Sequence, residues 1–316
     1  MPIVIAHRGA SAYLPEHTLM SKALAHSMEV DFLEQDCVAS KDGVPVVLHD
    51  VHIDTVTNVA KVFPDRKRND GRYYAFDFTV AELKELRVFE RFDHRTGEAV
   101  YPLRYPVGHG DFQLVTLDEE LQFIANLNRT TGRSVGIYPE IKRPVWHREQ
   151  GVDLSVNMLR VLTNHGYTQK SDPCYLQCFD EAEVIRVRDE LGYQGLLIQL
   201  VYVGHDKESG TDYERLKSAD GMARAARVAD GLGPPIDDIV TWSADGKPNV
   251  TGFVQQAHSA GLDVHPWTLR ADSLPENCPS VDDLLRALFR SAGVDGLFAD
   301  HPDLAVKFKN ANENAR

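Results

Sequence analysis

Short apolar runs alternate with amphipathic segments along most of the chain. Nine runs have β-strand character, and most of them end in polar or charged residues: Ile3–His7, Asp31–Asp36, Pro45–His49, Val135–Lys142, Cys174–Phe179, Leu196–Val201, Ala229–Leu232, Asp263–Thr268 and Gly296–Asp300. Segments with helical periodicity lie near residues 17–29, 79–87, 117–131, 151–165, 180–191, 212–228, 249–260 and 280–292. Strands and helices that alternate at this spacing predict a parallel sheet.

Several of the predicted helices begin with a recognisable capping signal. Thr79-Val-Ala-Glu82 and Thr116-Leu-Asp-Glu119 have the spacing of capping boxes, in which a threonine oxygen accepts a free helical N–H and the glutamate reaches back. Asp180 and Ser280 stand directly before two further helical segments and have the side chains preferred at an N-cap. These signals support the start positions of the helices.

The third strand-like run departs from the alternation. Only eight residues separate Asp36 from Pro45, and they include the tight-turn sequence Lys41-Asp42-Gly43. Since a parallel crossover needs about a dozen residues or more, Pro45–His49 is expected to return antiparallel, as the second arm of a hairpin. The other runs then form eight βα units and predict a closed (β/α)8 TIM barrel. The alternative is an open doubly wound sheet, which usually carries a glycine-rich phosphate loop that is missing from this sequence.

Residues 51–111 interrupt the barrel pattern. They are rich in Asp, Arg, Lys, Tyr and Phe. Loops longer than about 12–15 residues usually carry a function or structure of their own. We therefore interpret residues 1–316 as one barrel domain in which residues 51–111 form an inserted subdomain at the rim of the active site.

Composition and charge exclude some classes of protein. The chain has 34 Lys and Arg against 47 Asp and Glu, a formal charge of -13, and it contains no run of 18 apolar residues. A membrane span and a nucleic-acid partner are therefore not expected. The sequence enters a strand within two residues of Met1, without the basic and apolar regions of a signal peptide. This favours the cytoplasm, and the alternative is the periplasm if a leader has been removed.

Titratable residues occur where four of the predicted strands end. They are His7 and Arg8, Glu34 and Asp36, His49, and Glu140 and Lys142. The active site of such a barrel lies at the C-terminal ends of its strands, so these side chains should share one mouth. Glu34 and Asp36 are two residues apart and point to the same face of a strand, as do Glu140 and Lys142.

Three converging carboxylates would repel one another unless a cation neutralised them, which favours a metal site. The alternative interpretation is that these residues form ion pairs at the protein surface. Glu34, Asp36 and Glu140 would supply hard oxygen ligands, which favour Ca²⁺ or Mg²⁺ over Zn²⁺. His7 and His49 are suited to proton transfer near neutral pH. With Arg8 and Lys142 as fixed cations, these parts describe metal-assisted cleavage of a phosphate diester inside an acidic protein.

The motifs around these residues resemble those of the glycerophosphodiester phosphodiesterase family, and most closely its bacterial periplasmic members. The matching segments are Ile5–Thr18, Leu33–Asp36, Lys41–Asp50, Tyr138–Lys142, Tyr175–Asp180, Val264–Thr268 and Asp295–Asp300, together with Phe63–Arg66 and Asp70–Tyr74 of the insertion. The resemblance implies a barrel with Ca²⁺ or Mg²⁺ held by Glu34, Asp36 and Glu140, His7 and His49 as acid and base, and phosphate contacts from Arg8 and Lys142.

The resemblance also implies a reaction. Glycerophosphocholine, glycerophosphoethanolamine and related diesters would be cleaved to sn-glycerol 3-phosphate and an alcohol, through a cyclic phosphate that water opens. Phe179 and Trp267 are then candidates for packing on the glycerol, and Gln177 for bonding a phosphate oxygen or a metal-bound water. His17 could face the substrate, although a role in capping the first helix would also explain it.

Other functions remain open at this point. A lysophospholipase D-like enzyme would need an apolar surface for an acyl chain. A non-catalytic binding protein on the same scaffold should have lost site residues, and a metal-dependent aldolase or isomerase would leave the second histidine unexplained. The sequence does not distinguish Ca²⁺ from Mg²⁺ or a monomer from a homodimer, and it does not identify the alcohol that is released.

Overall fold

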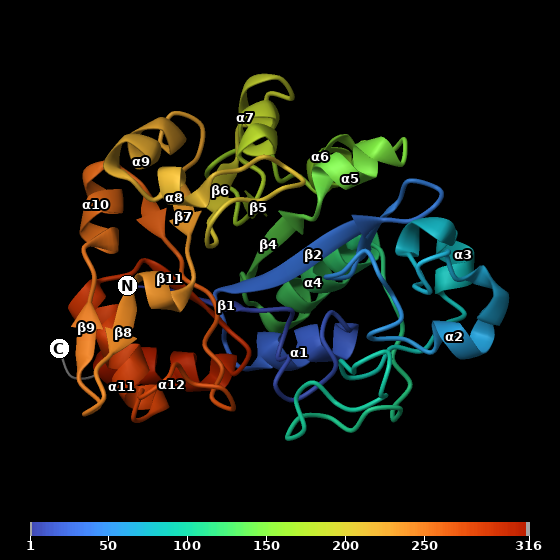
Figure 1. Cartoon of the computed structure of the whole chain (residues 1–316), viewed down its shortest axis with the longest axis horizontal. Coiled ribbons are helices and arrows are strands. Elements are labelled where there is room, and N and C mark those ends of the chain that lie inside the picture. Colours follow the sequence, from blue (N-terminus) through green and yellow to red (C-terminus); the bar gives the residue numbers. More distant parts are fainter. Residues whose placement is uncertain (1, 314–316) are drawn as a thin grey trace.

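The computed structural model describes residues 2–313, whose centre is a barrel of parallel strands (Figure 1). The eight parallel strands within this range are β1 (Ile3–Ala6), β2 (Phe32–Ala39), β4 (Gly136–Ile141), β5 (Tyr175–Cys178), β6 (Leu196–Leu200), β7 (Gly231–Gly233), β10 (Asp263–Val264) and β11 (Gly296–Ala299). They pair in the order β10-β7-β6-β5-β4-β2-β1-β11. The predicted fold class is confirmed.

Backbone hydrogen bonds join the two ends of this strand order and close the barrel. The Asp295 amide donates to the Val264 carbonyl over 2.9 Å, and the segment that follows β10 pairs with β11 at Leu269 and Ala299. The first and last strands of the chain are neighbours as well, with Ile3 opposite Gly296. Residues from both ends of the sequence therefore meet at the same mouth.

The predicted hairpin is also confirmed. Strand β3 (Pro45–Val47) pairs antiparallel with β2, with Val47 opposite Cys37. Gly43 has φ +75° in the turn between them, a conformation that costs glycine no steric strain. The strand ends just before His49, so this side chain is delivered to the mouth by the return arm of the hairpin.

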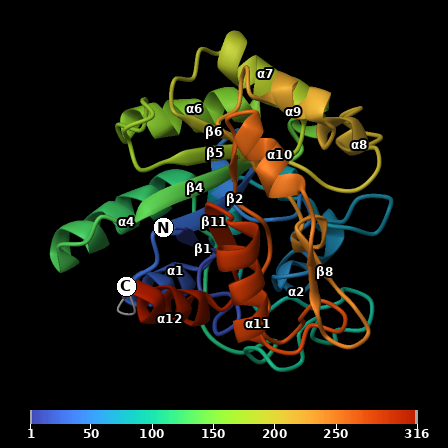
Figure 2. The same cartoon turned by 90° about the vertical axis from the view of Figure 1, so that its left-hand side faces the viewer.

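Helices surround the barrel, as the views in Figures 1 and 2 show. They are α1 (Leu19–Ser27), α4 (Leu117–Thr131), α5 (Pro144–Glu149), α6 (Leu154–Asn164), α7 (Glu181–Asp189), α8 (Tyr213–Leu216), α9 (Ala219–Ala225), α10 (Phe253–Ser259), α11 (Val281–Arg286), which continues as a π-helix over Ala287–Ala292, and α12 (Pro302–Glu313). The capping boxes of Thr116 and Thr79 and the N-caps Asp180 and Ser280 form as predicted. Within residues 2–313, no helix is both long and apolar enough to cross a membrane.

Outside the insertion, two of the helix predictions were wrong in part, and one helix was not predicted. The segment 212–228 forms two helices, because the Ser218 side chain caps a new helix by accepting from the Gly221 amide. Residues Pro248–Val250 form strand β9, which pairs with β8 (Val240–Trp242), so the following helix begins only at Phe253. Helix α12 packs beside β1 and β11 but was not predicted. The second half of its sequence is mostly polar, so the helical spacing of its apolar residues is not evident.

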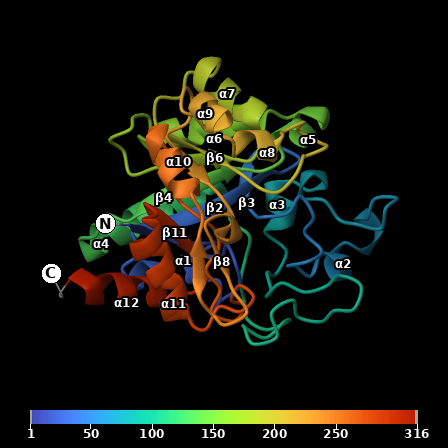
Figure 3. The same cartoon turned by 60° about the vertical axis from the view of Figure 1, so that its left-hand side comes forward.

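The insertion has an apolar cluster of its own beside the hairpin. It contains α2 (Val59–Val62), α3 (Val80–Leu83) and two short 3₁₀ turns, η1 (Pro64–Arg66) and η2 (Ala75–Asp77). Its buried residues include Ile53, Val56, Val59, Phe78, Leu83, Leu86 and Val88, which pack with Val38 and Val46 of the hairpin. Figures 1 and 3 show its helices α2 and α3 on the opposite side of the barrel from α11 and α12. The predicted helix 79–87 belongs to the insertion and covers only Val80–Leu83.

A buried ion pair joins α1, α4 and β2 behind the mouth. The Lys22 Nζ lies 2.7 Å from Glu120 Oε1, and both side chains are completely buried. Lys22 also donates to the main-chain oxygen of Glu34, in β2. A buried charge that loses its partner is strongly destabilising, so each member of this pair depends on the other.

The change Lys22→Met is expected to lower the free energy of unfolding by about 3–5 kcal/mol, because it leaves the Glu120 carboxylate buried and unpaired. Adding Glu120→Leu should restore much of the loss, since apolar side chains can replace a buried ion pair at little cost. Urea unfolding followed by circular dichroism measures both variants. A double variant no more stable than the single one would contradict this reading of the pair.

Candidate active site

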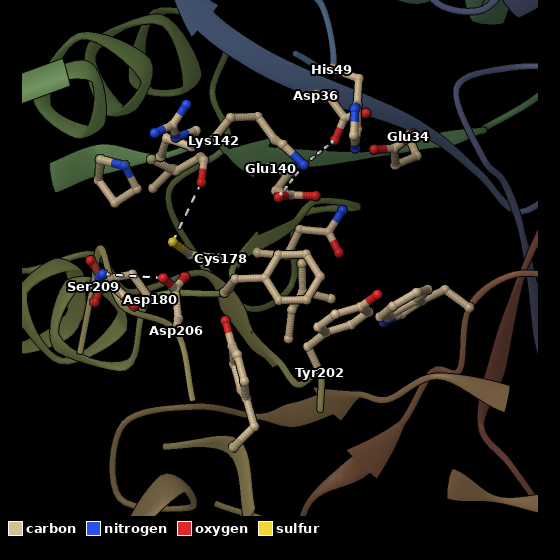
Figure 4. A pocket seen from close by; sticks show the side chains of 18 of the residues that line it. Glu34, Asp36, His49, Glu140, Lys142, Cys178, Asp180, Tyr202, Asp206 and Ser209 are labelled. Atoms are coloured by element: carbon tan, nitrogen blue, oxygen red, sulfur yellow. Dashed lines mark hydrogen bonds and ion pairs between the residues drawn. The ribbon is translucent and has the colours of Figure 1, made fainter. Parts of the chain in front are cut away.

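A cavity of about 670 Å³ opens at the C-terminal ends of the barrel strands (Figure 4). All ten residues predicted for the site line this cavity: His7, Arg8, Glu34, Asp36, His49, Glu140, Lys142, Gln177, Phe179 and Trp267. They come from five barrel strands or the loops directly after them and from the hairpin. Beneath the cavity, Ile5, Tyr138, Ile198 and Phe298 pack together, so the barrel interior is filled and the space lies only at the mouth.

Carboxylates from β2 and β4 converge on one wall of the cavity. Glu34 and Asp36 alternate with Gln35 along β2, and Glu140 of β4 lies directly beside Asp36 in the parallel register. The backbone N–H of Arg8 donates to Glu34 Oε2 over 2.6 Å. All three carboxylates are buried.

Burial and mutual repulsion make this group hard to ionise fully. Burial, with the Asp36 charge adding to it, raises the pKa of Glu34 well above its usual value. Burial also raises the pKa of Glu140, to about 8, against the opposing effect of Lys142. Burial alone would raise the pKa of Asp36 too, but nearby Lys142 and His49 hold it well below its ordinary value.

This set of donors fits a hard divalent cation, because a bound cation would relieve both the repulsion and the cost of burial. His17 adds an imidazole to the group: its Nε2 is 2.8 Å from Asp36 Oδ2. Potential ligand atoms of His17, Glu34 and Asp36 lie within 4.8 Å of one another. The structure therefore contains a buried, mainly acidic site that could hold a metal ion.

The two histidines are held in the same way. His7 Nδ1 lies 2.6 Å from Asp300 Oδ1, and His49 Nδ1 lies 2.6 Å from Asp50 Oδ1. Because a carboxylate accepts hydrogen bonds, each Nδ1 carries the proton and each Nε2 has a lone pair, which in His7 accepts a hydrogen bond from Arg8 Nε over 3.3 Å. Burial and the Arg8 charge lower the pKa of His7 to about 4 and that of His49 to about 3, so both rings are neutral and able to accept a proton at neutral pH.

Two cations stand beside the carboxylates. Arg8 follows β1 with φ +59°, and its guanidinium lies 3.1 Å from Glu16 and 3.4 Å from Asp36. The Lys142 Nζ lies 2.8 Å from Glu140 and 3.6 Å from Asp36, and Figure 4 shows this side chain reaching toward both. These cations place fixed positive charge beside the carboxylates of the mouth.

The remaining predicted residues form the other side of the cavity. Gln177 is buried and lies beside Glu140 in the register, and its Oε1 has no hydrogen-bond partner among the described residues. Phe179 and Trp267 meet edge to face with ring centres 5.9 Å apart. Tyr202, which was not predicted, stacks on Trp267 at 5.7 Å and is 49% exposed. Together the three rings make an aromatic wall.

Some functional neighbours were not identified from the sequence. Thr18 of the Pro15–Thr18 motif caps helix α1, while His17 adopts φ +59° and contacts Asp36, so this motif contributes to both the cap and the site. Asp50 and Asp300 hold the histidines. Their signals were available, since Asp50 follows His49 directly and Asp300 ends a predicted strand.

Comparison with known proteins connects this geometry to a family. The sequence model of the glycerophosphoryl diester phosphodiesterase family matches residues 7–304. A glycerophosphodiester phosphodiesterase of Haemophilus influenzae is 41% identical over 324 aligned residues, covering 97% of this chain and 89% of that protein. One from Treponema pallidum is 37% identical and covers 97% of this chain and 91% of that protein.

A solved structure has the same fold. It is an Oleispira antarctica phosphodiesterase in complex with the product sn-glycerol-3-phosphate, with a TM-score of 0.64 and 22% identity, and the match covers 98% of this chain and 97% of that one. The sequence matches extend over the barrel and the whole set of residues at its mouth. The chain therefore belongs to the glycerophosphoryl diester phosphodiesterase family, and it is an enzyme that hydrolyses glycerophosphodiesters.

Proposed function

We propose that the enzyme hydrolyses glycerophosphocholine, glycerophosphoethanolamine and related diesters to sn-glycerol 3-phosphate and an alcohol, with the aid of a divalent cation and two histidines. One observation carries the proposal. His7 and His49, each held at Nδ1 by an aspartate over 2.6 Å, line the same cavity as a buried group of carboxylates. The sn-glycerol-3-phosphate bound by the Oleispira antarctica relative supports the choice of product.

Glu34, Asp36 and Glu140 are the residues that would hold the cation, and His17 is close enough to add a fourth ligand. Oxygen donors favour Ca²⁺ or Mg²⁺. A bound cation supplies charge that stabilises the negative oxygens of the phosphate. Arg8 and Lys142 add fixed positive charge from the protein, and the unpartnered oxygen of Gln177 is available to accept from a substrate hydroxyl or a water.

In the first step, one neutral histidine takes the proton of the glycerol hydroxyl next to the ester, as that oxygen attacks phosphorus. The other histidine, protonated beside the bound phosphate anion, gives its proton to the alcohol oxygen as the P–O bond breaks. A cyclic phosphate is left. In the second step the roles reverse: one histidine deprotonates water, and the other returns a proton to the glycerol oxygen as the ring opens.

The aromatic wall is assigned to the carbon skeleton of the substrate. We propose that Phe179 and Trp267 pack on the glycerol, whose carbon skeleton carries no charge. The Trp267 Nε1 donates to the Gly233 carbonyl over 2.8 Å, which fixes the orientation of the indole ring. Substrate would thus be held with its phosphate toward Arg8 and its glycerol against the rings.

Residues 51–111 are proposed to form a rim subdomain within one domain of residues 1–316. The separate apolar cluster of this segment, shared with the hairpin, supports the assignment. Its position beside β3 supports a role at the mouth, because β3 delivers His49.

A lysophospholipase D-like activity is the second candidate. Tyr202 and Val203 line the cavity and are 49% and 58% exposed, and such an apolar edge could accept an acyl chain. Equal rates on a lysophospholipid and on the matching deacylated diester would favour this candidate. A strong preference for the deacylated substrate would exclude it.

The purified enzyme is expected to release sn-glycerol 3-phosphate from glycerophosphocholine. A coupled assay with glycerol-3-phosphate dehydrogenase detects the product, and parallel reactions with glycerophosphoethanolamine compare the head groups. Release of phosphocholine and glycerol instead would show that the other P–O bond is cleaved and would contradict the proposed orientation of the substrate.

A further inference from the structure

We infer that the insertion supplies two positioning residues, Arg91 and Arg104, which hold the two catalytic histidines through the aspartates behind them. The inference rests on the proposed two-histidine mechanism and extends it. The insertion lies outside the strand ends on which the barrel chemistry was expected. Nevertheless, both arginines reach from it to the carboxylates that orient His7 and His49.

Arg104 acts on the side of His7. Its Nη2 donates to Asp300 Oδ2 over 2.7 Å, while Asp300 Oδ1 accepts from His7 Nδ1 over 2.6 Å. The Arg104 side chain is only 4% exposed and also binds Asp272 through two hydrogen bonds of 2.8 and 3.1 Å. Its guanidinium lies 3.7 Å from the centre of the Tyr101 ring. Arg104 is therefore fixed in place, and together with Arg270, whose Nε donates to the same Asp300 Oδ2 over 3.0 Å, it holds the Asp300 carboxylate in one orientation.

Arg91 acts on the side of His49. Its Nη1 donates to Asp50 Oδ2 over 2.5 Å, while Asp50 Oδ1 accepts from His49 Nδ1 over 2.6 Å. Two further bonds, of 2.6 and 3.1 Å, run from Arg91 to Glu16, which in turn binds the Arg8 guanidinium. Arg91 thus supports both a histidine and the cation that is proposed to contact phosphate.

The same pattern occurs on both sides of the cavity. One oxygen of each aspartate accepts from histidine, and the other accepts from an arginine of the insertion. With both oxygens bound, the carboxylate cannot turn, so the plane and tautomer of the imidazole are set. These are not exposed ion pairs of low value, because Arg104 and Asp300 are 4% and 3% exposed and Arg91 is 15% exposed.

The position of the imidazole is important because proton transfer needs an aligned donor and acceptor. A misplacement of about 1 Å can lower the rate of a catalysed step by about 10²-fold. Loss of either arginine should therefore reduce turnover without removing a group that touches substrate. The loss of Arg91 should also have a different effect from the loss of Arg104. Arg104 supports only one of the catalytic groups, a histidine, whereas Arg91 also supports Arg8, which is proposed to contact phosphate.

The variants Arg104→Gln and Arg91→Gln test this with glycerophosphocholine as substrate. Arg104→Gln is expected to lower kcat by about 10-fold or more with little change in KM, and Arg91→Gln to lower kcat and raise KM. Arg104→Lys, which keeps the charge and can reach one oxygen, should fall between Arg104→Gln and the wild type. If Arg104→Gln does not fold, the Lys variant and its kcat provide the same comparison.

Arg68→Gln is the matched control. Arg68 belongs to the same insertion, makes a bidentate pair with Asp77 at 2.7 and 2.8 Å, and lies 4.1 Å over the Tyr74 ring. Its hydrogen bonds and ring contacts in the described part of the chain involve neither histidine–aspartate pair. Its kcat should stay within about twofold of the wild type, so an equal loss in all three Gln variants would show a general effect of the insertion and overturn the inference.

A double-mutant cycle with Asp300→Asn shows whether Arg104 acts through Asp300. In the Asn background, Arg104→Gln should cost less than about twofold in kcat, because the link to His7 is already weakened. An undiminished cost there would overturn the inference. Retention of kcat in both arginine variants, with a large loss on histidine substitution, would also overturn it but leave the proposed function intact. Near-normal activity of the histidine variants would instead overturn the proposed function itself.

Discussion

Replacing His7 or His49 by alanine is expected to lower kcat by at least ~10²-fold, the usual cost of removing a general acid or base. Each ring lines the cavity and is held at Nδ1 by an aspartate, which leaves Nε2 as the atom that moves protons. Because the reaction needs an acid and a base in each step, either change should remove one partner from both steps. Steady-state release of sn-glycerol 3-phosphate from glycerophosphocholine measures the effect.

His258→Ala is a suitable control for the histidine variants. His258 also pairs with an aspartate, since its Nε2 lies 2.8 Å from Asp295 Oδ2, but that aspartate precedes β11 whereas Asp300 follows it. The control removes a histidine–aspartate pair at the opposite end of the same strand. Its kcat should remain within about twofold of the wild type. A loss below about tenfold in both His7→Ala and His49→Ala would remove these residues from the mechanism.

Removal of divalent cations is expected to abolish activity, and Ca²⁺ or Mg²⁺ should restore it. Without a cation, burial and mutual repulsion raise the pKa of Glu34 and Glu140, and the positive charge that would stabilise the phosphate oxygens is missing. Dialysis against EDTA followed by titration of each ion into the assay measures the restored rate. It also identifies the ion that supports the faster reaction.

Substitutions at the proposed ligands test where the cation binds. Glu34→Ala and Asp36→Asn should weaken Ca²⁺ or Mg²⁺ binding by about 10-fold or more in isothermal titration calorimetry, and activity should fall with it. His17→Gln removes the proposed fourth ligand and leaves the three carboxylates in place. Its effect on cation binding therefore measures the contribution of the imidazole. Activity that survives both cation removal and Glu34→Ala would exclude the metal-dependent mechanism.

The local patterns of the chain predicted the barrel, because alternation and short turns act over a few residues. The eight βα units and the hairpin at Pro45–Val47 follow from such patterns. Helix α12 and the β8–β9 hairpin do not, since the first has a polar half and the second has strands of only three residues. Spacing alone is weak evidence for elements this short or this polar.

The candidate site was predictable to the extent that it lies at strand ends. The i, i+2 phase of Glu34 and Asp36 and their position on β2 were enough to place them at the mouth. The contacts between the insertion and the barrel were not predictable, because no local pattern pairs Arg104 with a residue 196 positions later. The contact of His17 with Asp36 was not predictable for a different reason: it depends on a positive φ before helix α1.

The pairing of β1 with β11 has a consequence for the order in which the enzyme is made. His7 is synthesised before its partner Asp300, which lies 293 positions later in the chain. At about 5–20 residues per second, roughly 15–60 s of synthesis separate the two. The Asp300 carboxylate that orients His7 is therefore added only after the seven other parallel strands have been made, so a growing chain lacks a complete site until β11 joins the barrel.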